Sequence, residues 1–494
     1  PPQLPARGWC DDRKTMCRER TANEPLSWEE VHQEVTGGRK LLVLDGNVYD
    51  VGEWVNKHPG GKVLLSYVGE DASDAYGAFH KVAEGSEGKK SLDKYLKPLL
   101  VGPLKAGKTG PKAEEHAATH DQGLERDFRK LRKDLEEAGM FKPKLWFYGL
   151  MLAHILLLEA AGWATLKYFG TGWAPYCAAV ALLVTAQAQA GWLQHDFGHL
   201  SVFKSRAWNL RMHRFVILHL KAASSAWWNY RHYLHHAKPN VAETDPDINM
   251  PYVFMLGNDM SKNWAQKQKE GKKAQSLPYD FQHQYWWLIG PPLLLPVYFH
   301  YENLRFLIGN AVFGRSGMWK DSYSTKHYMR HGRVFFWKEL AWMASFFVRW
   351  HFTYGPLLGG ALGWMTLYMV VRTVESHWFV WVTQMNHLSM DINKYSLRGR
   401  RDWPSLQAVA TCNVDGGWFN DWFTGHLNYQ IEHHLFPTMP RHNYAKVAPL
   451  VQAMFEKNGR GSDYVSKTLL GAMGDIVSSL ETYGSVWREA YTEF

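Results

Sequence analysis

The sequence predicts a mainly α-helical protein that is embedded in a membrane through about four transmembrane helices and carries a small α+β domain at its N-terminus. Two apolar segments, at residues 145–168 and 173–193, are each long enough to cross a hydrocarbon core of roughly 30 Å. Strand, turn and helix signals gather near the N-terminus, which indicates a separate domain. We therefore divide the 494 residues into a tail at 1–21, the small domain at 22–104, a linker at 105–123 and a membrane domain at 124–494.

Local signals define the elements of the small domain. Ser27 and Glu30 have the spacing of a capping box, which predicts the start of a helix. Asp45-Gly46 predicts a hairpin turn between two short runs of apolar and β-branched residues. The remaining predicted elements are strands at residues 41–44 and 48–51 and helical stretches around residue 60 and at residues 71–79.

Two histidines in this domain are candidate haem ligands. His58 lies in the turn His58-Pro-Gly-Gly61, and His80 follows the predicted helix. Neutral imidazoles can bind a haem iron from both faces, and glycines let the backbone approach a porphyrin closely. The alternative is a surface turn with an unrelated helix histidine, but the strands and Tyr49-Asp-Val-Gly-Glu-Trp54 just upstream favour haem. Residues 25–100 resemble the cytochrome b5 family, in which the positions of His58 and His80 are the axial ligands.

The first two apolar segments are expected to form a membrane hairpin, preceded by a charged amphipathic helix at residues 128–139. Arg206, Arg211 and Arg214 follow this hairpin, and an excess of basic residues marks the cytoplasmic side. Residues 208–228 mix Trp, Arg and aliphatic side chains, so we expect this segment to lie in the membrane interface rather than to span it.

Three more apolar stretches follow, at residues 286–307, 335–352 and 357–374. If histidines before residue 240 and after residue 425 meet at one site, an even number of crossings must separate them. We favour the last two stretches as a second hairpin, because the turn between them carries no charge. Residues 286–307, interrupted by three prolines, are then re-entrant or interfacial. The alternative makes them a full span and leaves a basic lumenal loop. After residue 439, amphipathic helices are expected at residues 445–456 and 465–480.

Seven histidines of the membrane domain fall into three clusters: His195 and His199; His232, His235 and His236; and His433 and His434. Residues three or four apart share one face of a helix, so each cluster can direct its imidazoles to a common point. Seven histidines exceed the needs of one zinc ion and suit a pair of transition-metal ions, with iron the natural candidate. Asp196, Asp245 and Glu432 are candidate acceptors for the outer ring N–H groups, or else solvated helix charges.

The chain resembles the front-end fatty acid desaturases, and more closely the animal acyl-CoA Δ5/Δ6-type group. The resemblance runs from about residue 25 to the C-terminus. Besides the cytochrome-b5-like start, three motifs carry it: His235-His-Ala-Lys-Pro-Asn240, Trp381-Val-Thr-Gln-Met-Asn-His387 and Asn428-Tyr-Gln-Ile-Glu-His-His-Leu-Phe-Pro-Thr-Met-Pro440. It implies four transmembrane helices, a cytosolic di-iron centre, and a double bond introduced between an existing one and the carboxyl end.

Two further candidate ligands come from this resemblance. Gln430 stands where the family pattern leads one to expect a first histidine in the third cluster, and its carbonyl oxygen could ligate weakly or hold a water. His387 follows the last apolar segment and could close the coordination sphere, as an outlying histidine does in the wider class of membrane desaturases. A packed interfacial histidine is the alternative for His387.

The expected activity is the O2-dependent desaturation of a polyunsaturated fatty acyl-CoA or acyl lipid, with haem b and two iron ions as cofactors. Electrons are expected from NADH-cytochrome b5 reductase through the haem domain, and the acyl chain is expected in an apolar tunnel lined by Trp, Phe and Tyr. The expected location is the endoplasmic reticulum membrane, in a multi-pass arrangement with both cofactors facing the cytosol. Alternatives are a sphingolipid desaturase, a membrane di-iron hydroxylase, and an electron carrier whose clusters bind zinc.

The formal charge of +9 does not indicate nucleic-acid binding, because the basic residues flank apolar segments and the 24 tryptophans are scattered. Membrane headgroups and an anionic acyl carrier explain it better. The four cysteines show no paired pattern, which is typical of reduced cytosolic thiols. Residues 102–109 match the phosphate-loop pattern GxxxxGK[ST], but Gly110 and Pro111 would break the helix that such a loop requires.

Overall fold

The computed structural model describes residues 24–492, apart from residues 56, 81–86, 106–121, 243, 251–252, 273–276, 314–332 and 393–401. The predicted N-terminal tail lies outside the described residues, as do most of the predicted linker and the second half of the phosphate-loop pattern.

The N-terminal domain contains a three-stranded antiparallel sheet in the order β1-β2-β3. Ser27 and Glu30 form the predicted capping box, each side chain accepting a hydrogen bond from the other's backbone N–H. Asp45 and Gly46 both have positive φ, as a two-residue hairpin turn requires, which confirms the predicted hairpin. The elements are α1 (Trp28–Thr36), β1 (Leu41–Leu44), β2 (Asn47–Asp50), η1 (Gly61–Tyr67), α2 (Ser73–Phe79), α3 (Glu87–Leu96), η2 (Lys97–Leu99) and β3 (Leu100–Pro103).

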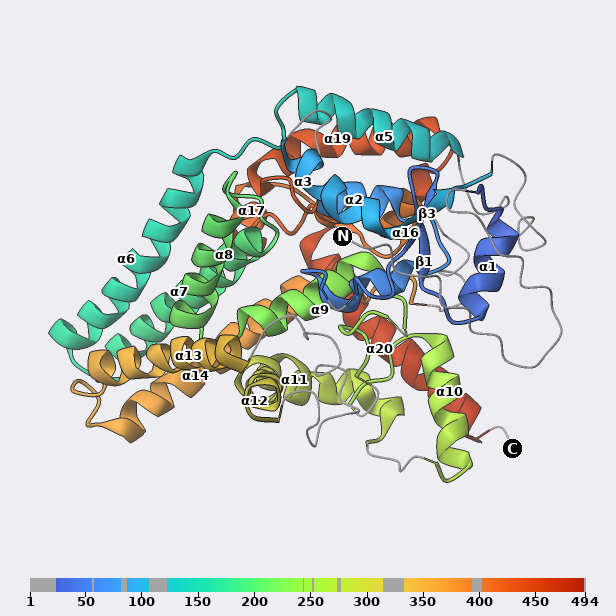
Figure 1. The fold of residues 1–494 in the computed structure, drawn as a ribbon. Helices are drawn as coiled ribbons and strands as arrows, with labels where there is room; N and C mark the ends of the chain where they lie inside the picture. The colour runs from blue at the N-terminus through green and yellow to red at the C-terminus, as the bar shows by residue number, and fades with distance from the viewer. Residues whose placement is uncertain are drawn as a thin grey trace.

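Four long helices form two antiparallel hairpins that extend together from one side of the molecule (Figure 1): α6 (Leu145–Phe169), α7 (Trp173–Gly198), α13 (Arg333–Tyr354) and α14 (Ala361–Gln384). By length and composition, two of the described helices, α6 and α7, could cross a membrane. By this criterion the structure supports the first two of the four predicted transmembrane helices. Helices α13 and α14 carry charged residues that are buried among the helices, among them Glu339, Arg372 and Glu375, and these lower their hydropathy.

The proline-containing stretch that we expected to be re-entrant or interfacial is helical but irregular. Helix α11 (Gln282–Leu293) contains Pro291 and Pro292, and it continues through the π-helical turn η5 (Leu294–Phe299) into α12 (His300–Ile308) and η6 (Gly309–Phe313). Helix α11 packs against α14, so that both contribute to the interior beside the histidine clusters.

The remaining helices form a body at the base of the long hairpins (Figure 1): α5 (Gln122–Glu137), α8 (Arg206–Arg214), η3 (Phe215–Leu220), α9 (Ser225–Ala237), α10 (Asn258–Lys269), η4 (Tyr279–Phe281), α16 (Trp403–Val409), α17 (Trp418–Thr424), α18 (Gln430–Leu435), η8 (Arg441–Asn443), α19 (Tyr444–Lys457), η9 (Gly461–Asp463) and α20 (Leu469–Thr492). Helix α19 agrees with the prediction. The last helix begins later than predicted, because strand β5 (Ser466–Lys467) pairs in parallel with β4 (Asn413–Val414).

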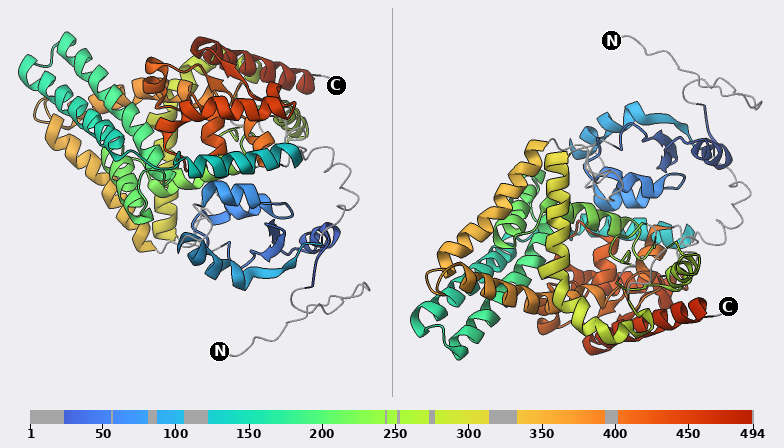
Figure 2. Two further views of the ribbon diagram at one scale, coloured as in Figure 1. Left: turned by 90° about the horizontal axis from the view of Figure 1, so that it is seen from above. Right: turned by 90° about the horizontal axis from the view of Figure 1, so that it is seen from below.

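The N-terminal domain packs against this body rather than standing apart from it (Figure 2). The Tyr67 hydroxyl donates a hydrogen bond of 2.7 Å to the carbonyl oxygen of Ala237 at the end of α9. Next to it, Lys238 forms an ion pair of 2.5 Å with Glu70. Two chain segments that are about 170 residues apart in sequence are therefore joined at the helix that carries the second histidine cluster.

Candidate metal centres and haem site

The three histidine clusters lie at the C-terminal ends of α7 and α9 and in the short helix α18, and these three segments meet in the structure. His195 lies in the last turn of α7 and His199 is its C-cap residue. Helix α9 is capped by the hydroxyl of Ser224 and carries the second cluster on its last turns. The short helix α18 carries the third cluster.

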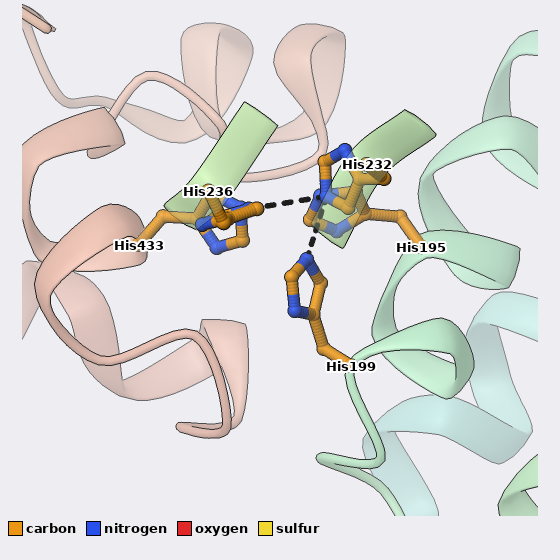
Figure 3. Close-up of side chains that lie close together, drawn as sticks. All are labelled: His195, His199, His232, His236 and His433. Carbon is orange, nitrogen blue, oxygen red and sulfur yellow. Dashed lines mark hydrogen bonds between the residues drawn. The ribbon is translucent and has the colours of Figure 1, made fainter. Parts of the chain in front are cut away.

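Five imidazoles form a first group: His195, His199, His232, His236 and His433 (Figure 3). One ring nitrogen from each lies within 4.8 Å of those of the others. The Nε2 atom of His232 is 2.7 Å from Nε2 of His199 and 3.1 Å from Nε2 of His236. Hydrogen bonds between the rings can pair these nitrogens only two at a time, because a neutral imidazole has one donor and one acceptor, whereas a cation can be bound by all five at once.

A second group contains His235, His387 and His434. The amide of Gln430 lies against it, with Nε2 at 2.9 Å from Nε2 of His387. The structure thus brings together all nine candidate residues of the membrane domain and divides them between two adjacent groups. Neighbouring residues such as His235 and His236 go to different groups because consecutive side chains point about 100° apart on a helix.

The donor set fits a pair of transition-metal ions. Within the described residues, the Nε2 atoms of His433 and His434 and the Oε1 atom of Gln430 are buried without a hydrogen-bond partner. Buried polar atoms rarely lack a partner, so a missing ligand is the direct explanation. Burial lowers the pKa of His199 and of His387 to about 3, with nearby imidazoles adding to the effect. The rings of His199 and His387 are thus neutral, the form that binds metal.

Each group is held from outside by hydrogen bonds to the second ring nitrogen. His235 Nδ1 lies 2.8 Å from Oδ2 of the fully buried Asp245, which confirms the predicted acceptor. The Nδ1 atom of His434 lies 2.9 Å from Oε1 of Gln407, and that of His433 lies 3.1 Å from the hydroxyl of Tyr444. These bonds leave Nε2 of each ring directed towards the groups.

Two of the three predicted carboxylate acceptors have other partners. Asp196 forms a buried ion pair of 3.1 Å with Arg441. Glu432 accepts hydrogen bonds from Asn413 and from the hydroxyl of Tyr464. Each carboxylate directly neighbours a cluster histidine in sequence, so it points to a different side of its helix. Gln407 and Tyr444, which do orient the rings, give no signal in the sequence because their spacing from the clusters follows no motif.

The N-terminal histidines face each other across a gap of the right size for one iron. The ring centroids of His58 and His80 are 6.0 Å apart. A metal–imidazole nitrogen distance of about 2 Å on each side fits this separation. His80 donates its Nδ1–H to the carbonyl oxygen of Tyr76 at 3.0 Å, which leaves Nε2 for the metal. A methyl group at Gly60 would lie 2.9 Å from Val63, so the turn beside His58 requires glycine.

One side chain connects this site with the metal groups. The ring of Phe79, which directly precedes His80, has its centroid 6.2 Å from that of His236 and 5.9 Å from that of Trp403. The end of α2, which is followed by the candidate haem ligand His80, therefore packs against the candidate metal ligand His236.

An apolar cavity of about 310 Å³ lies beside both groups, and five of the candidate ligands contribute to its wall: His195, His232, His235, His387 and Gln430. Most other lining residues are apolar, with aromatic rings from five helical elements and from the segment between α9 and α10: Trp192, Trp227, Trp228, Phe254, Trp286, Tyr298, Phe299 and Phe379. A cavity of the predicted composition is thus present next to the metal groups.

The fold and the site define a helical protein with two histidine-rich groups that could hold metal ions, an apolar cavity beside them and a fused domain with two facing histidines. Residues 171–465 match the model of the fatty acid desaturase family, and residues 27–105 match that of the cytochrome b5-like haem/steroid binding domain. The first match covers more than half of the chain, and the chain belongs to the fatty acid desaturase family. These families make it an O2-dependent oxidoreductase with haem and di-iron cofactors and a fatty acyl substrate.

Replacing His58 or His80 by Ala should abolish the haem Soret band, because one axial ligand cannot hold the haem iron in this site. Absorption spectra of the purified full chain provide the measurement. His32→Ala is the matched control, since His32 lies in the same domain and its Nδ1 lies 2.8 Å from the carbonyl oxygen of Trp28 within α1. A Soret band of normal size in both ligand variants would contradict the assignment.

Asp245→Asn should lower the affinity of the second group for iron by roughly 10- to 100-fold, because the amide no longer holds His235 as a carboxylate does. Iron per chain, measured by inductively coupled plasma mass spectrometry, tests this. The exposed Asp415→Asn serves as control. Equal iron content in the two variants would remove Asp245 from this role.

Proposed function

We propose that the protein is a front-end fatty acyl desaturase that introduces a cis double bond between an existing double bond and the carboxyl end of a polyunsaturated acyl chain. The observation that carries this proposal is the apolar cavity, whose wall includes ligands from both histidine groups. An acyl chain in this cavity has its methylenes beside the metal groups. The carrier is proposed to be coenzyme A, whose phosphates would bind Lys and Arg side chains on the cytosolic side.

The first histidine group and the second, completed by Gln430, are proposed to hold one iron each. Gln430 presents an amide to the second group, and rotation of this amide by half a turn would exchange Nε2 for the unpartnered Oε1. That oxygen, directly or through a water, would supply the weakest ligand of the set. His387 lies within this group rather than at a distance from it, which supports its assignment as a ligand.

The bound irons supply the oxygen-derived oxidant that removes two hydrogens from adjacent methylenes. The residues of the protein position the acyl chain and exclude water from the cavity. The aromatic lining holds an extended acyl chain and leaves it little freedom, and misplacement by about 1 Å is enough to slow such a reaction severely. Asp245, Gln407 and Tyr444 keep the imidazoles in one orientation, so that the reacting carbons meet a fixed geometry.

Electrons are proposed to enter from NADH-cytochrome b5 reductase through the haem domain. The docking of this domain on α9 supports the proposal, because the two sites then share one buried interface. We place the protein in the endoplasmic reticulum membrane, with α6, α7, α13 and α14 crossing it and both cofactor sites facing the cytosol. Arg206, Arg211 and Arg214 follow α7 on that side.

Expression of the full chain in yeast supplied with a series of polyunsaturated fatty acids, followed by fatty-acid profiling, tests the proposed function. A new double bond on the carboxyl side of an existing one supports it. A hydroxylated product would identify a hydroxylase, and activity on long-chain bases alone would identify a sphingolipid desaturase. Purified protein that contains zinc only and consumes no O2 would contradict any desaturase function.

His235→Ala should eliminate the desaturated product, because it removes a ligand from the second group. It also leaves the buried carboxylate of Asp245 without its histidine partner. The haem Soret band should persist, since His235 lies outside the haem domain. His283→Ala, which changes a histidine of α11 outside both groups, should retain product formation. Wild-type activity in the His235 variant would exclude the second group from catalysis.

Phe79→Ala should slow the reoxidation of the reduced haem by O2 in the presence of acyl substrate several-fold, because the variant removes the ring between His80 and His236. Stopped-flow absorbance at the Soret band measures this rate. Phe79→Tyr retains the ring and should retain the rate. Equal rates in all three proteins, at equal haem and iron content, would show that the ring does not couple the two sites.

A further inference from the structure

Helix α9 connects both metal groups with the rest of the molecule. Its last turns carry His232 and His236 of the first group and His235 of the second. The N-terminal domain is attached at its C-terminal end, where the carbonyl oxygen of Ala237 accepts the hydrogen bond from Tyr67. A displacement of α9 along its axis would therefore move ligands of both groups at the same time.

The start of α9 is fixed by a buried carboxylate from a different helix. Glu339 of α13 is buried, and both of its oxygens accept hydrogen bonds from the first residues of α9. Its Oε2 atom accepts from the hydroxyl of Ser224 at 2.6 Å and from the backbone N–H of Ala226 at 3.2 Å. Its Oε1 atom accepts from the hydroxyl of Ser225. The two serines are themselves buried.

A second side chain holds the same end of α9. The Oδ1 atom of Asn303 in α12 accepts a hydrogen bond of 2.6 Å from the backbone N–H of Ser224. Its Nδ2 atom donates to the carbonyl oxygen of Phe299 at 2.6 Å. The ring of Phe299 lies against that of Trp227 in the first turn of α9, with the centroids 4.8 Å apart. The start of α9 is thus bound both from α13 and from the irregular segment η5–α12.

A carboxylate suits this place for an electrostatic reason. The first backbone N–H groups of a helix have no acceptor within the helix, and this end of the helix carries a partial positive charge. The hydroxyl of Ser224 accepts from the N–H of Trp227 at 3.1 Å, which satisfies one of these donors. Glu339 accepts from another, at Ala226, and adds the negative charge that the helix end favours. Without it, an N–H group and two hydroxyls would be buried without this acceptor.

We infer that Glu339 is a positioning residue for the metal groups. It fixes where α9 lies along its own axis, and thereby the distances from the imidazoles of α9 to those on α7 and to His387. The two places are well separated, since Ala226 precedes His232 by six residues, about 9 Å along a helix. Because the hydrogen bonds of a helix run along its axis, a shift at its start reaches the ligands. This inference rests on the proposed function, in which both groups hold iron.

Mössbauer spectroscopy of the full-length holoprotein loaded with ⁵⁷Fe tests the inference. Glu339→Ala should still bind haem and iron, but its quadrupole splittings should differ from those of the wild type because the ligand distances change. Its kcat should fall roughly 10- to 100-fold, since a misplacement of about 1 Å that originates far from the chemistry has an effect of this size. A wild-type spectrum in the folded Glu339 variant, with iron bound, would overturn the inference.

Glu159→Gln is the matched control for this comparison. It also removes a buried carboxylate that contacts α13, but the partners of Glu159 are Arg349 of α13 and Gln187 of α7 rather than the start of α9. Its iron spectrum should therefore equal that of the wild type, and a change as large as in the Glu339 variant would overturn the inference. Wild-type protein without iron in either group would overturn the proposed function together with the inference, so the two failures are distinguishable.

A double-mutant cycle tests whether Glu339 acts through the start of α9. Ser225→Ala removes one donor to this carboxylate and should lower kcat less than Glu339→Ala does. The double variant should lose little beyond Glu339→Ala alone, because residues that share one interaction are not additive. Losses that multiply in the double variant would show that the two residues act independently, which would overturn the inference.

Hydrogen exchange of the full chain, followed by mass spectrometry, gives a readout that needs no turnover. Backbone N–H groups at the start of α9 should exchange faster in Glu339→Ala, and equal exchange there would overturn the inference. Haem content identifies a variant that fails to fold. In that case Glu339→Gln, which keeps the size and one acceptor oxygen but removes the charge, replaces Glu339→Ala. A changed iron spectrum in the folded Gln variant supports the inference, and a wild-type spectrum contradicts it.

Discussion

The structure depends on the burial of neutral imidazoles whose second nitrogens are already bonded. A buried imidazole without a partner loses the hydrogen bonds that water would give it. In this protein the Nδ1 atoms of His235, His433 and His434 have protein partners, so each ring is oriented before any ligand reaches Nε2. Because the ligands of the first group come from α7, α9 and α18, which are far apart in the sequence, the metal groups exist only when the whole body is folded. The function is thus tied to global packing rather than to the histidine motifs alone.

Local patterns in the sequence predicted the first helix and the hairpin of the N-terminal domain and located the histidine clusters, but they did not predict α3 or β3. The capping box at Ser27 and the turn at Asp45 depend on residues within four positions of one another, and the structure has both. Helical spacing accounts for His195 with His199 and for His232 with His236, but the expectation that each cluster points to one place was wrong, since His235 and His434 lie in the second group. Partners that depend on long-range packing could not be predicted: Gln407 is 27 residues from His434, and no pattern connects them. For Asp196 and Glu432, neighbourhood in sequence suggested a contact that the helix geometry does not allow.

Of the described helices, α6 and α7 are apolar enough to cross a membrane, whereas the second helical hairpin, α13 and α14, is less apolar. Helices α13 and α14 carry charged residues that pair inside the bundle, such as Arg349 with Glu159 of α6 at 2.6 Å. A hydropathy average over a sequence window treats these charges as unpaired, whereas in the structure they form ion pairs with charged residues of neighbouring helices. Ion pairs of this kind are costly to break, since removal of one partner leaves a buried charge. They also specify which helices can pack together, because an apolar helix face would leave the partner charge unsatisfied.

The attachment of the N-terminal domain on α9, through Tyr67 and Lys238, has a kinetic consequence. A donor on the same chain meets its acceptor at an effective concentration in the millimolar range for short connections, whatever the amount of protein in the cell. In the proposed electron route, the step from the haem domain to the metal groups therefore needs no diffusional encounter with a free carrier protein.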